Sequence, residues 1–92
     1  MENSIEPLHP FGNVITALKC IQGCKAYRSG WNGKGIFIAL QKPDENSFMT
    51  SPYIYIDTTG LQTENNAAPK IRVPWLASQT DMLAEDWIIE NI

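Results

Sequence analysis

The sequence has few residues of the kinds that hold metals or build disulfide frameworks. Cys20 and Cys24 are its two cysteines, and His9 is its one histidine, among 92 residues. A zinc site of the usual kind needs four ligands, and the cysteine spacing is not the C-x-x-C spacing of redox proteins. We therefore expect two free thiols, no metal site and no cofactor.

Long apolar runs and targeting signals are also missing. No stretch approaches the length of a membrane span, and the first residues lack the basic and apolar parts of a signal peptide. The net charge of −3 argues against general binding to a nucleic-acid backbone. These absences predict a soluble, cytoplasmic protein with neither a membrane nor a nucleic-acid polymer among its partners.

Motifs of common catalytic sites are absent as well. The sequence contains no H-E-x-x-H, no P-loop and no G-x-S-x-G nucleophile elbow. Asp81, Glu85 and Asp86 form a group of carboxylates, but helix capping and solvation explain them better than acid–base chemistry does. We expect no catalytic residues and no enzyme activity.

What is present is the composition of one small domain. A chain that is 43% hydrophobic and 18% charged is globular, and 92 residues leave no room for a second core. Residues 1–10 carry two prolines and no periodicity, which predicts an N-terminal arm before a single domain over residues 11–92. Burial in so small a domain is limited, so self-association is a source of extra stability.

A helical pattern begins directly after the arm. The apolar residues that share one helical face are Phe11, Val14, Ile15, Leu18 and Ile21. Gly23 then suits the C-cap of this helix. Cys20 lies nearly opposite the apolar stripe, so it either faces solvent or packs against something outside the monomer core.

Short strands and a second helix make up the rest. Strands are predicted over residues 25–28, 36–40, 53–58, 70–73 and 87–89. Ser78 as N-cap, with Asp81 in the first turn, predicts a short helix that extends to Glu85. Polar loops are expected over residues 43–51 and 62–69. The sum is an α+β fold, in which the N-terminal helix packs on a small antiparallel sheet.

Two of these strands carry information about partners. Residues 36–40 are apolar on both faces, which implies a cover on each side, one of them from another subunit. In the strand 53–58, the isoleucines form the core face, while Tyr53, Tyr55 and Asp57 share the other. This tyrosine face suits an interface or a wet pocket.

The stretch 28–35 holds three glycines, a tryptophan and two cations. Glycines at such density indicate backbone conformations closed to other residues, or a close approach to the backbone. Trp31 here, and Trp75 after a proline, are either core plugs or platforms on which a flat ring stacks. Trp87, on a closing strand, is better explained as a core residue.

Groups that bind phosphate surround these tryptophans in the sequence. Backbone N–H groups of the Gly33–Gly35 turn and of the helix start at Ser78 are potential phosphate donors. Arg28 and Lys34 can neutralise phosphate charge. The chain has no acidic residue from Pro7 to Pro43, which indicates either a local positive site for a small anion or a chance asymmetry.

Two segments together resemble a known family. The first contains Phe11-Gly12, the predicted helix and Arg28-x-Gly-Trp-Asn-Gly-Lys-Gly; the second runs from Val73-Pro-Trp-Leu-Ala-Ser-Gln-Thr-Asp to Trp87. Both resemble the small phage and prophage proteins of the Thoeris anti-defence family, second type. The chain differs from the family pattern in its N-terminal arm and in a longer loop at 62–69, and a loop near the pocket would alter ligand preference.

The resemblance implies a function that composition does not reveal. Members of this family sequester a cyclic ADP-ribose isomer, glycocyclic ADP-ribose, that a bacterial Toll/interleukin-receptor-domain enzyme makes as an immune signal. They withhold this signal from the defence effector without degrading it. Some members also bind cyclic dinucleotides at separate sites, and the family forms homotetramers with ligand pockets between subunits.

Carried onto this chain, the resemblance gives a set of candidate ligand-binding residues. We expect Trp31 or Trp75 to stack on the adenine, and Arg28 and Lys34 to lie near phosphate. Asp81 would bind hydroxyl groups, since a carboxylate repels phosphate. The complete set is Arg28, Trp31, Asn32, Gly33, Lys34, Tyr53, Pro74, Trp75, Ala77, Ser78, Gln79 and Asp81. The alternatives are an inhibitor that binds a host defence protein and a hydrolase that degrades the signal.

Overall fold

A computed structural model of the chain describes residues 8–31 and 33–91. In chain order it contains α1 (Phe11–Cys20), β1 (Cys24–Arg28), β2 (Phe37–Gln41), β3 (Tyr53–Asp57), β4 (Arg72–Pro74), α2 (Gln79–Leu83) and β5 (Trp87–Asn91). The strands form one five-stranded sheet in the order β4-β3-β2-β1-β5, and every neighbouring pair is antiparallel. The predicted α+β fold, with one long and one short helix, is confirmed within these residues.

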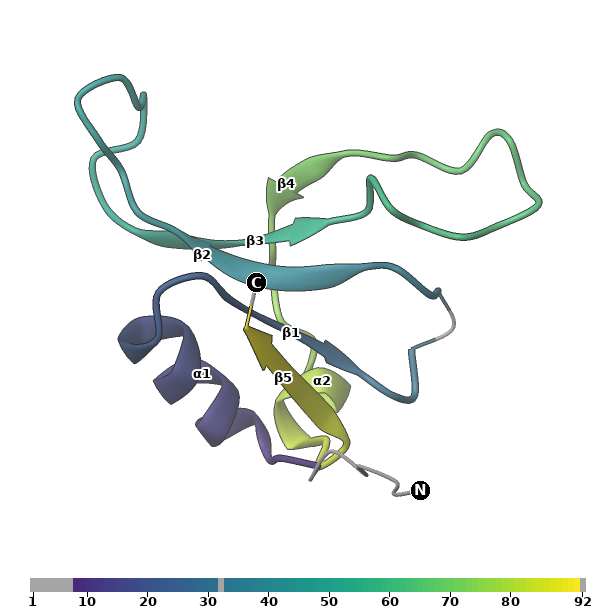
Figure 1. Cartoon of the computed structure of the whole chain (residues 1–92). Helices are drawn as coiled ribbons and strands as arrows, with labels where there is room; N and C mark the ends of the chain where they lie inside the picture. The colour runs from purple at the N-terminus through teal and green to yellow at the C-terminus, as the bar shows by residue number, and fades with distance from the viewer. Residues whose placement is uncertain (1–7, 32, 92) are drawn as a thin grey trace.

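Both helices lie toward the β1–β5 side of the molecule (Figure 1). Helix α1 contacts β1, β2 and β5 on one face of the sheet, and it also contacts α2. The β2–β3 and β3–β4 connections extend away from the helices (Figure 1). These two connections contain the polar loops predicted over residues 43–51 and 62–69; neither loop forms a helix or a strand, and Gln62 makes an isolated bridge with Lys34.

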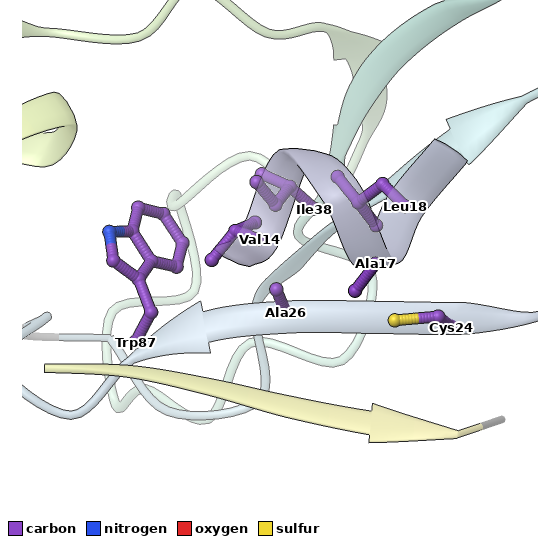
Figure 2. Packing of buried hydrophobic residues seen from close by; sticks show 7 residues of the cluster. All are labelled: Val14, Ala17, Leu18, Cys24, Ala26, Ile38 and Trp87. Atoms are coloured by element: carbon purple, nitrogen blue, oxygen red, sulfur yellow. The ribbon is translucent and has the colours of Figure 1, made fainter. Parts of the chain in front are cut away.

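The core lies between α1 and the strands that it covers. Figure 2 shows Val14, Ala17 and Leu18 of α1 above Ala26 and Cys24 of β1, with Ile38 and Trp87 beside them. Alanine on both sides lets the helix approach the sheet closely. Val14, Ile38 and Trp87 are fully buried, and burial of each large apolar side chain stabilises the fold by roughly 2–3 kcal/mol. The prediction that Trp87 is a core residue is confirmed.

Helix α1 ends earlier than its apolar pattern predicted. Its C-cap is Ile21, which has extended backbone and whose N–H donates to the Ala17 carbonyl. Ile21 is 46% exposed, so its assignment to the buried stripe was wrong. Gly23 is not the cap; its φ of 81° instead serves the turn that leads into β1. Cys20 is exposed at the helix end and Cys24 is buried, and both are free thiols.

Strand β2 has one cover from this chain. Ile38 faces α1, and the register places Ala39 on the opposite face, opposite Lys25 and Tyr55. Ala39 is only 3% exposed because side chains of neighbouring strands enclose it. Among the described residues, no helix or strand lies over this face; we call it the open face of the sheet.

Strand β4 and helix α2 are shorter than predicted. The paired part of β4 starts at Arg72 rather than at residue 70. Both backbone groups of Ile71 bind Thr58 instead: the Ile71 carbonyl accepts the Thr58 N–H, and the Ile71 N–H donates to the Thr58 hydroxyl. Helix α2 ends at Leu83, and Glu85 lies beyond its C-cap, Ala84. The Ser78 cap is confirmed, because its hydroxyl accepts the backbone N–H of Asp81 at 3.0 Å.

The glycine-rich turn is required for a close approach. Gly35 has a φ of 86°, and a Cβ at this position would collide with the carbonyl oxygen of Gly60. The adjacent Lys34 carbonyl accepts the Gln62 N–H at 2.9 Å. The turn before β2 is thus joined to the turn after β3, and other residues are excluded at position 35 on both conformational and steric grounds.

Candidate ligand-binding site

The three tryptophans meet in one aromatic cluster, although they are distant in sequence. The ring centroid of Trp87 lies 5.2 Å from that of Trp31 and 6.1 Å from that of Trp75, and both pairs are edge-to-face. Phe11 completes the cluster, with its ring 5.6 Å from Trp87 and 6.0 Å from Trp75. Such edge-to-face pairs add about 0.5–1.5 kcal/mol beyond the area that they bury.

Trp31 and Trp75 differ from Trp87 in burial. Trp87 is fully enclosed, whereas both of the others are half-buried. Each therefore packs one part of its ring system on the core and leaves another part accessible. The two interpretations of these residues, core plug and stacking platform, are compatible in this geometry.

A network of charged groups borders the aromatic cluster. Arg28, at the end of β1, donates from Nε to Asp86 at 2.8 Å and from Nη1 to Asp81 Oδ1 at 2.9 Å. Asp86 Oδ2 also accepts the Gly30 N–H at 2.8 Å. The guanidinium group thus ties β1 and the glycine-rich turn to α2 and to the residue before β5. All three side chains are at most one-quarter exposed, so solvent screens these pairs weakly.

Asp81 connects this network to the tryptophans. Its Oδ1 accepts the Trp31 indole N–H at 3.1 Å, and its backbone carbonyl accepts the Trp87 indole N–H at 3.0 Å. In Figure 2 the Trp87 indole nitrogen lies on the side away from Val14. One residue therefore fixes the orientation of two indole rings.

The network determines which groups stay charged. Burial opposes ionisation of Asp81, but hydrogen bonds from Arg28 and Trp31 outweigh it and hold the pKa of Asp81 below its ordinary value. For Asp86, the Arg28 hydrogen bond is the largest influence and lowers its pKa as well. The pKa of Arg28 is raised by its hydrogen bonds to Asp86 and Asp81. All three groups are ionised at neutral pH, and their summed charge is negative.

Two polar atoms of the network remain available. Within residues 8–31 and 33–91, no hydrogen bond is formed by Arg28 Nη2, and the Asp81 carboxylate, which interacts with Arg28, Trp31 and Ser78, keeps acceptor capacity on Oδ2. These atoms supply one donor and one acceptor beside the half-buried Trp31. Hydroxyl groups, which both donate and accept, match such a pair.

Comparisons with known proteins place this arrangement in a family. The family model of the Thoeris anti-defense 2-like domain matches residues 9–90. This chain belongs to that family. It is also similar to a protein named Thoeris anti-defense 2 from Bacillus phage SP01, with 41% identity over 87 residues, which cover 86% of this chain and 91% of the phage protein. The resemblance inferred from two segments is therefore confirmed, and it extends across the sheet that joins them.

The structure brings some of the predicted site residues together. Arg28, Trp31 and Asp81 are in direct contact, and Ser78 caps the same short helix. Trp75 joins them through Trp87. Gln79 begins α2 and is exposed, and Ala77 precedes the cap and is half-buried. Asn32 lies outside the described residues.

Other predicted residues lie elsewhere. Tyr53 and Pro74 line a cavity on the open face of the sheet, away from the aromatic cluster. Lys34 is exposed, and Gly33 packs so closely on Leu61 that a Cβ would come within 2.9 Å of that side chain. The roles of the twelve residues in ligand binding stay predictions.

The sequence reading missed two residues of this region. Asp86 was expected to be solvated, but it is half-buried and paired with Arg28. Its position directly before Trp87, at the start of a strand, was the sequence feature that could have indicated its burial. Phe11 was assigned to the core, yet it also flanks Trp75. The described residues contain no group of three or more His, Cys, Asp or Glu side chains arranged to hold a metal ion. Within the same residues, no helix is long and apolar enough to cross a membrane.

Proposed function

We propose that this protein counters Thoeris defence by binding and sequestering a cyclic ADP-ribose isomer, glycocyclic ADP-ribose, without turning it over. Membership of the Thoeris anti-defense 2-like family supports the biological setting. The observation that carries the ligand assignment is the cluster of half-buried Trp31 and Trp75 beside the Arg28–Asp81 pair. Indole rings bind adenine by stacking, and Asp81 Oδ2 can accept a ribose hydroxyl.

The charge of the network decides how phosphate would be held. Arg28 already faces two carboxylates, so it offers one remaining N–H edge rather than a free positive charge. The diphosphate of the ligand would then rely on Arg28 Nη2, on the exposed Lys34 and on backbone N–H groups of the glycine-rich turn. This division of roles keeps Asp81 for hydroxyl groups and leaves Lys34 as the main source of net positive charge.

A second copy of the chain would complete the pocket. Sequestration of a signal needs a Kd near 1 nM, or about −12 kcal/mol, and such affinity requires a pocket that encloses most of the ligand. The half-buried rings of one chain offer a wall rather than an enclosure. We therefore include a homotetramer in the proposal, acting in the cytoplasm of the infected bacterium, with cyclic dinucleotides as a further ligand class at a separate site. Light scattering should give about four times the monomer mass of 10.3 kDa.

Isothermal titration with glycocyclic ADP-ribose tests the proposal. We expect stoichiometric heat and nanomolar affinity. Trp31→Ala and Trp75→Ala should each weaken binding by about 5- to 150-fold, because each removes about 1–3 kcal/mol of stacking. Phe48→Ala is the matched control, since Phe48 is 96% exposed on the β2–β3 connection and should leave affinity unchanged.

Folding controls separate binding from packing in these variants. Circular dichroism and thermal melts of each variant are needed, because both rings also pack on Trp87. No heat and no thermal shift of the wild-type protein at tens of micromolar ligand would refute the assignment. Mass spectrometry of ligand released by heating distinguishes sequestration, which returns intact ligand, from hydrolysis, which returns product.

A protein-binding inhibitor is the second candidate function. It is favoured by the exposure of three large apolar side chains, Phe48 at 96%, Leu76 at 91% and Leu83 at 78%. Replacement of all three by serine should abolish capture of a stoichiometric host protein if this function is correct. If the variant loses no anti-defence activity in infected cells, these three side chains are irrelevant to function.

A further inference from the structure

Asp86, directly before β5, binds the three consecutive residues that precede Trp31. Its Oδ1 accepts Arg28 Nε at 2.8 Å, and its Oδ2 accepts the Gly30 N–H at 2.8 Å. The Ser29 hydroxyl donates to the same Oδ2 at 3.4 Å, and the Ser29 N–H donates to the Asp86 backbone carbonyl at 3.0 Å. One residue at the start of β5 therefore holds the beginning of the glycine-rich turn in place.

The glycine at position 30 makes room for this carboxylate. A Cβ on Gly30 would lie 2.7 Å from Asp86 Oδ2, which is closer than a side-chain atom can approach. Gly30 does not have a positive φ, so its backbone conformation is open to other residues. The contact with Asp86, and not the backbone, is therefore what requires glycine here.

Two routes lead from Asp86 to Trp31. The first is the backbone, because the Trp31 N–H donates to the Arg28 carbonyl at 3.2 Å within the turn that Asp86 holds. The second runs through side chains. Because Asp86 binds Nε, the Arg28 guanidinium is oriented with Nη1 2.9 Å from Asp81 Oδ1. The same Oδ1 accepts the Trp31 indole N–H at 3.1 Å, so the second route ends at the ring itself.

Asp86 is not itself suited to contact the ligand. Both of its carboxylate oxygens are engaged by the chain, and its side chain is 25% exposed. Its negative charge also repels a diphosphate. The donor on Arg28 Nη2 and the acceptor on Asp81 Oδ2 remain available, as described above. Any influence of Asp86 on binding is therefore exerted through its neighbours.

We propose that Asp86 is a positioning residue of the ligand site, which fixes the Trp31 ring and the free N–H edge of Arg28 in the orientation that the ligand needs. The inference rests on the function proposed above and adds a residue outside the predicted set. Groups that are already ordered lose less conformational entropy on binding, so a fixed ring and guanidinium increase affinity without any contact between Asp86 and the ligand.

Isothermal titration of Asp86→Asn with glycocyclic ADP-ribose tests the proposal. Asparagine keeps the size of the side chain, but its amide NH₂ cannot accept, so it satisfies either Arg28 Nε or the Gly30 N–H and not both. We expect binding to weaken by about tenfold. A pure charge effect has the opposite sign, because the loss of a negative charge favours a diphosphate.

The neighbouring Glu85 provides the control for charge. It is exposed and makes no hydrogen bond or ion pair to residues 8–31 or 33–91. Glu85→Gln therefore removes the same charge without disturbing the turn, and it should not weaken binding.

Gly30→Ala tests the same contact without changing any charge. The added methyl group must displace the Asp86 carboxylate, so binding should again weaken by about tenfold. Gly12→Ala is the matched control, since a Cβ at this position of α1 meets no atom within 4 Å and should leave affinity unchanged. Gly30→Ala keeps the proposal testable if Asp86→Asn does not fold.

Indole ¹⁵N–¹H spectra without ligand separate positioning from a general structural role. In both Asp86→Asn and Gly30→Ala, we expect the Trp31 indole signal to shift and its proton to exchange faster with solvent, because Asp81 Oδ1 is no longer held. The Trp87 indole donates to the Asp81 backbone carbonyl, so its signal should change little. A general loss of stability would affect both signals.

The contrary outcomes are distinct. Wild-type affinity in both variants would overturn the inference and leave the proposed function intact. A loss of affinity in Glu85→Gln as large as that in Asp86→Asn, or equal changes of the Trp31 and Trp87 signals, would also overturn it. No heat from the wild-type protein would instead refute the proposed function, and the inference with it.

Discussion

The two faces of this sheet are built from the same five strands but carry different kinds of side chain. Under α1, small and aliphatic side chains such as Ala26 and Ile38 pack with Trp87, and the described core residues are almost free of solvent. On the open face, Tyr53, Tyr55 and Arg72 surround a cavity, and the buried residues of this face include a carboxylate, Asp57, besides Ala39. One face completes a core within the monomer; the other presents oriented polar groups.

The difference shows how a small domain divides its surface. A chain of this length can enclose one layer of apolar side chains, and it uses α1 for that purpose. The half-buried tryptophans mark the edge of the enclosed layer, where Arg28 and Asp81 begin. The proposed binding groups therefore lie where the covered face ends and on the face that has no cover from the chain itself.

The largest difference between the two faces is expected for substitutions at neighbouring residues of β5. Trp87 points to the covered face and Ile88 to the open face. Trp87→Ala should lower the free energy of unfolding by about 3–5 kcal/mol, because it leaves a large cavity in the core. Ile88→Ala should cost about 1 kcal/mol or less. Urea unfolding measures both, and equal losses would mean that the open face is covered in solution.

The two arginine–carboxylate pairs provide the next test. Arg28→Met leaves two partly buried carboxylates without their partner and should cost about 2–3 kcal/mol. Arg72→Met, on the open face, removes a side chain that is 64% exposed but leaves Asp57, 5% exposed, without its cation, and should cost about 1–2 kcal/mol. Thr59 still binds Asp57 in the second variant. A larger loss for Arg72→Met would contradict the view that the network near Trp31 is the more enclosed one.

Acid should destabilise the protein through these same carboxylates. The pKa values of Asp57, Asp81 and Asp86 in the folded chain lie below the ordinary value of 3.8. As pH falls through 3.8, the unfolded chain takes up protons that the folded chain does not, so the free energy of unfolding decreases. This decrease continues until the pH passes the folded pKa values.

The acid dependence should differ between the variants. Arg28→Met raises the folded pKa of two carboxylates and should flatten the decrease between pH 5 and pH 3 more than Arg72→Met does, since Arg72 pairs with one. Urea titrations at several pH values provide the measurement. Identical slopes in both variants and wild type would show that the ion pairs do not set the acid stability.

The smallest expected effect concerns helix α1, which covers one face of the sheet. Gly12 lies in α1, and a Cβ at this position meets no atom within 4 Å. Gly12→Ala should raise the free energy of unfolding by about 0.5 kcal/mol, because glycine loses more backbone freedom in a helix. Gly35→Ala is the opposing control and should destabilise, since its φ of 86° excludes a Cβ. Thermal melts detect both changes.

Sequence reasoning succeeded where a local rule decides the structure. The period of Val14 and Leu18 located α1, the alternation of Ile54 and Ile56 fixed the core face of β3, and Ser78 marked the start of α2. It failed at the ends of elements. Ile21 continued the apolar period but left the helix, because the chain must turn at Gly23 to pair β1 with β5.

Only part of the candidate site could be predicted from the sequence. Trp31, Trp75 and Asp81 were identified as possible binding residues from their local setting, and Arg28 from its charge. Their mutual contacts were not foreseen, nor was the pairing of Arg28 with Asp86, because residues about 50–60 positions apart meet only through the sheet. Tyr53 and Pro74 belong to the same predicted set; within one chain the sheet register places them on the open face, and their role in binding stays a prediction.

The sequence alone determined the fold class, the positions of most strands and the family, since periodicity, capping and motif are properties of neighbouring residues. The tertiary structure alone decided that Trp87 lies at the centre of the aromatic cluster, that Asp81 orients two indoles, and that Arg72 lines a cavity on the open face. Each of these facts depends on which strands pair and in which register. The pairing and register of the strands follow from burying one face of the whole sheet under α1, so they cannot be deduced from any short segment of the sequence.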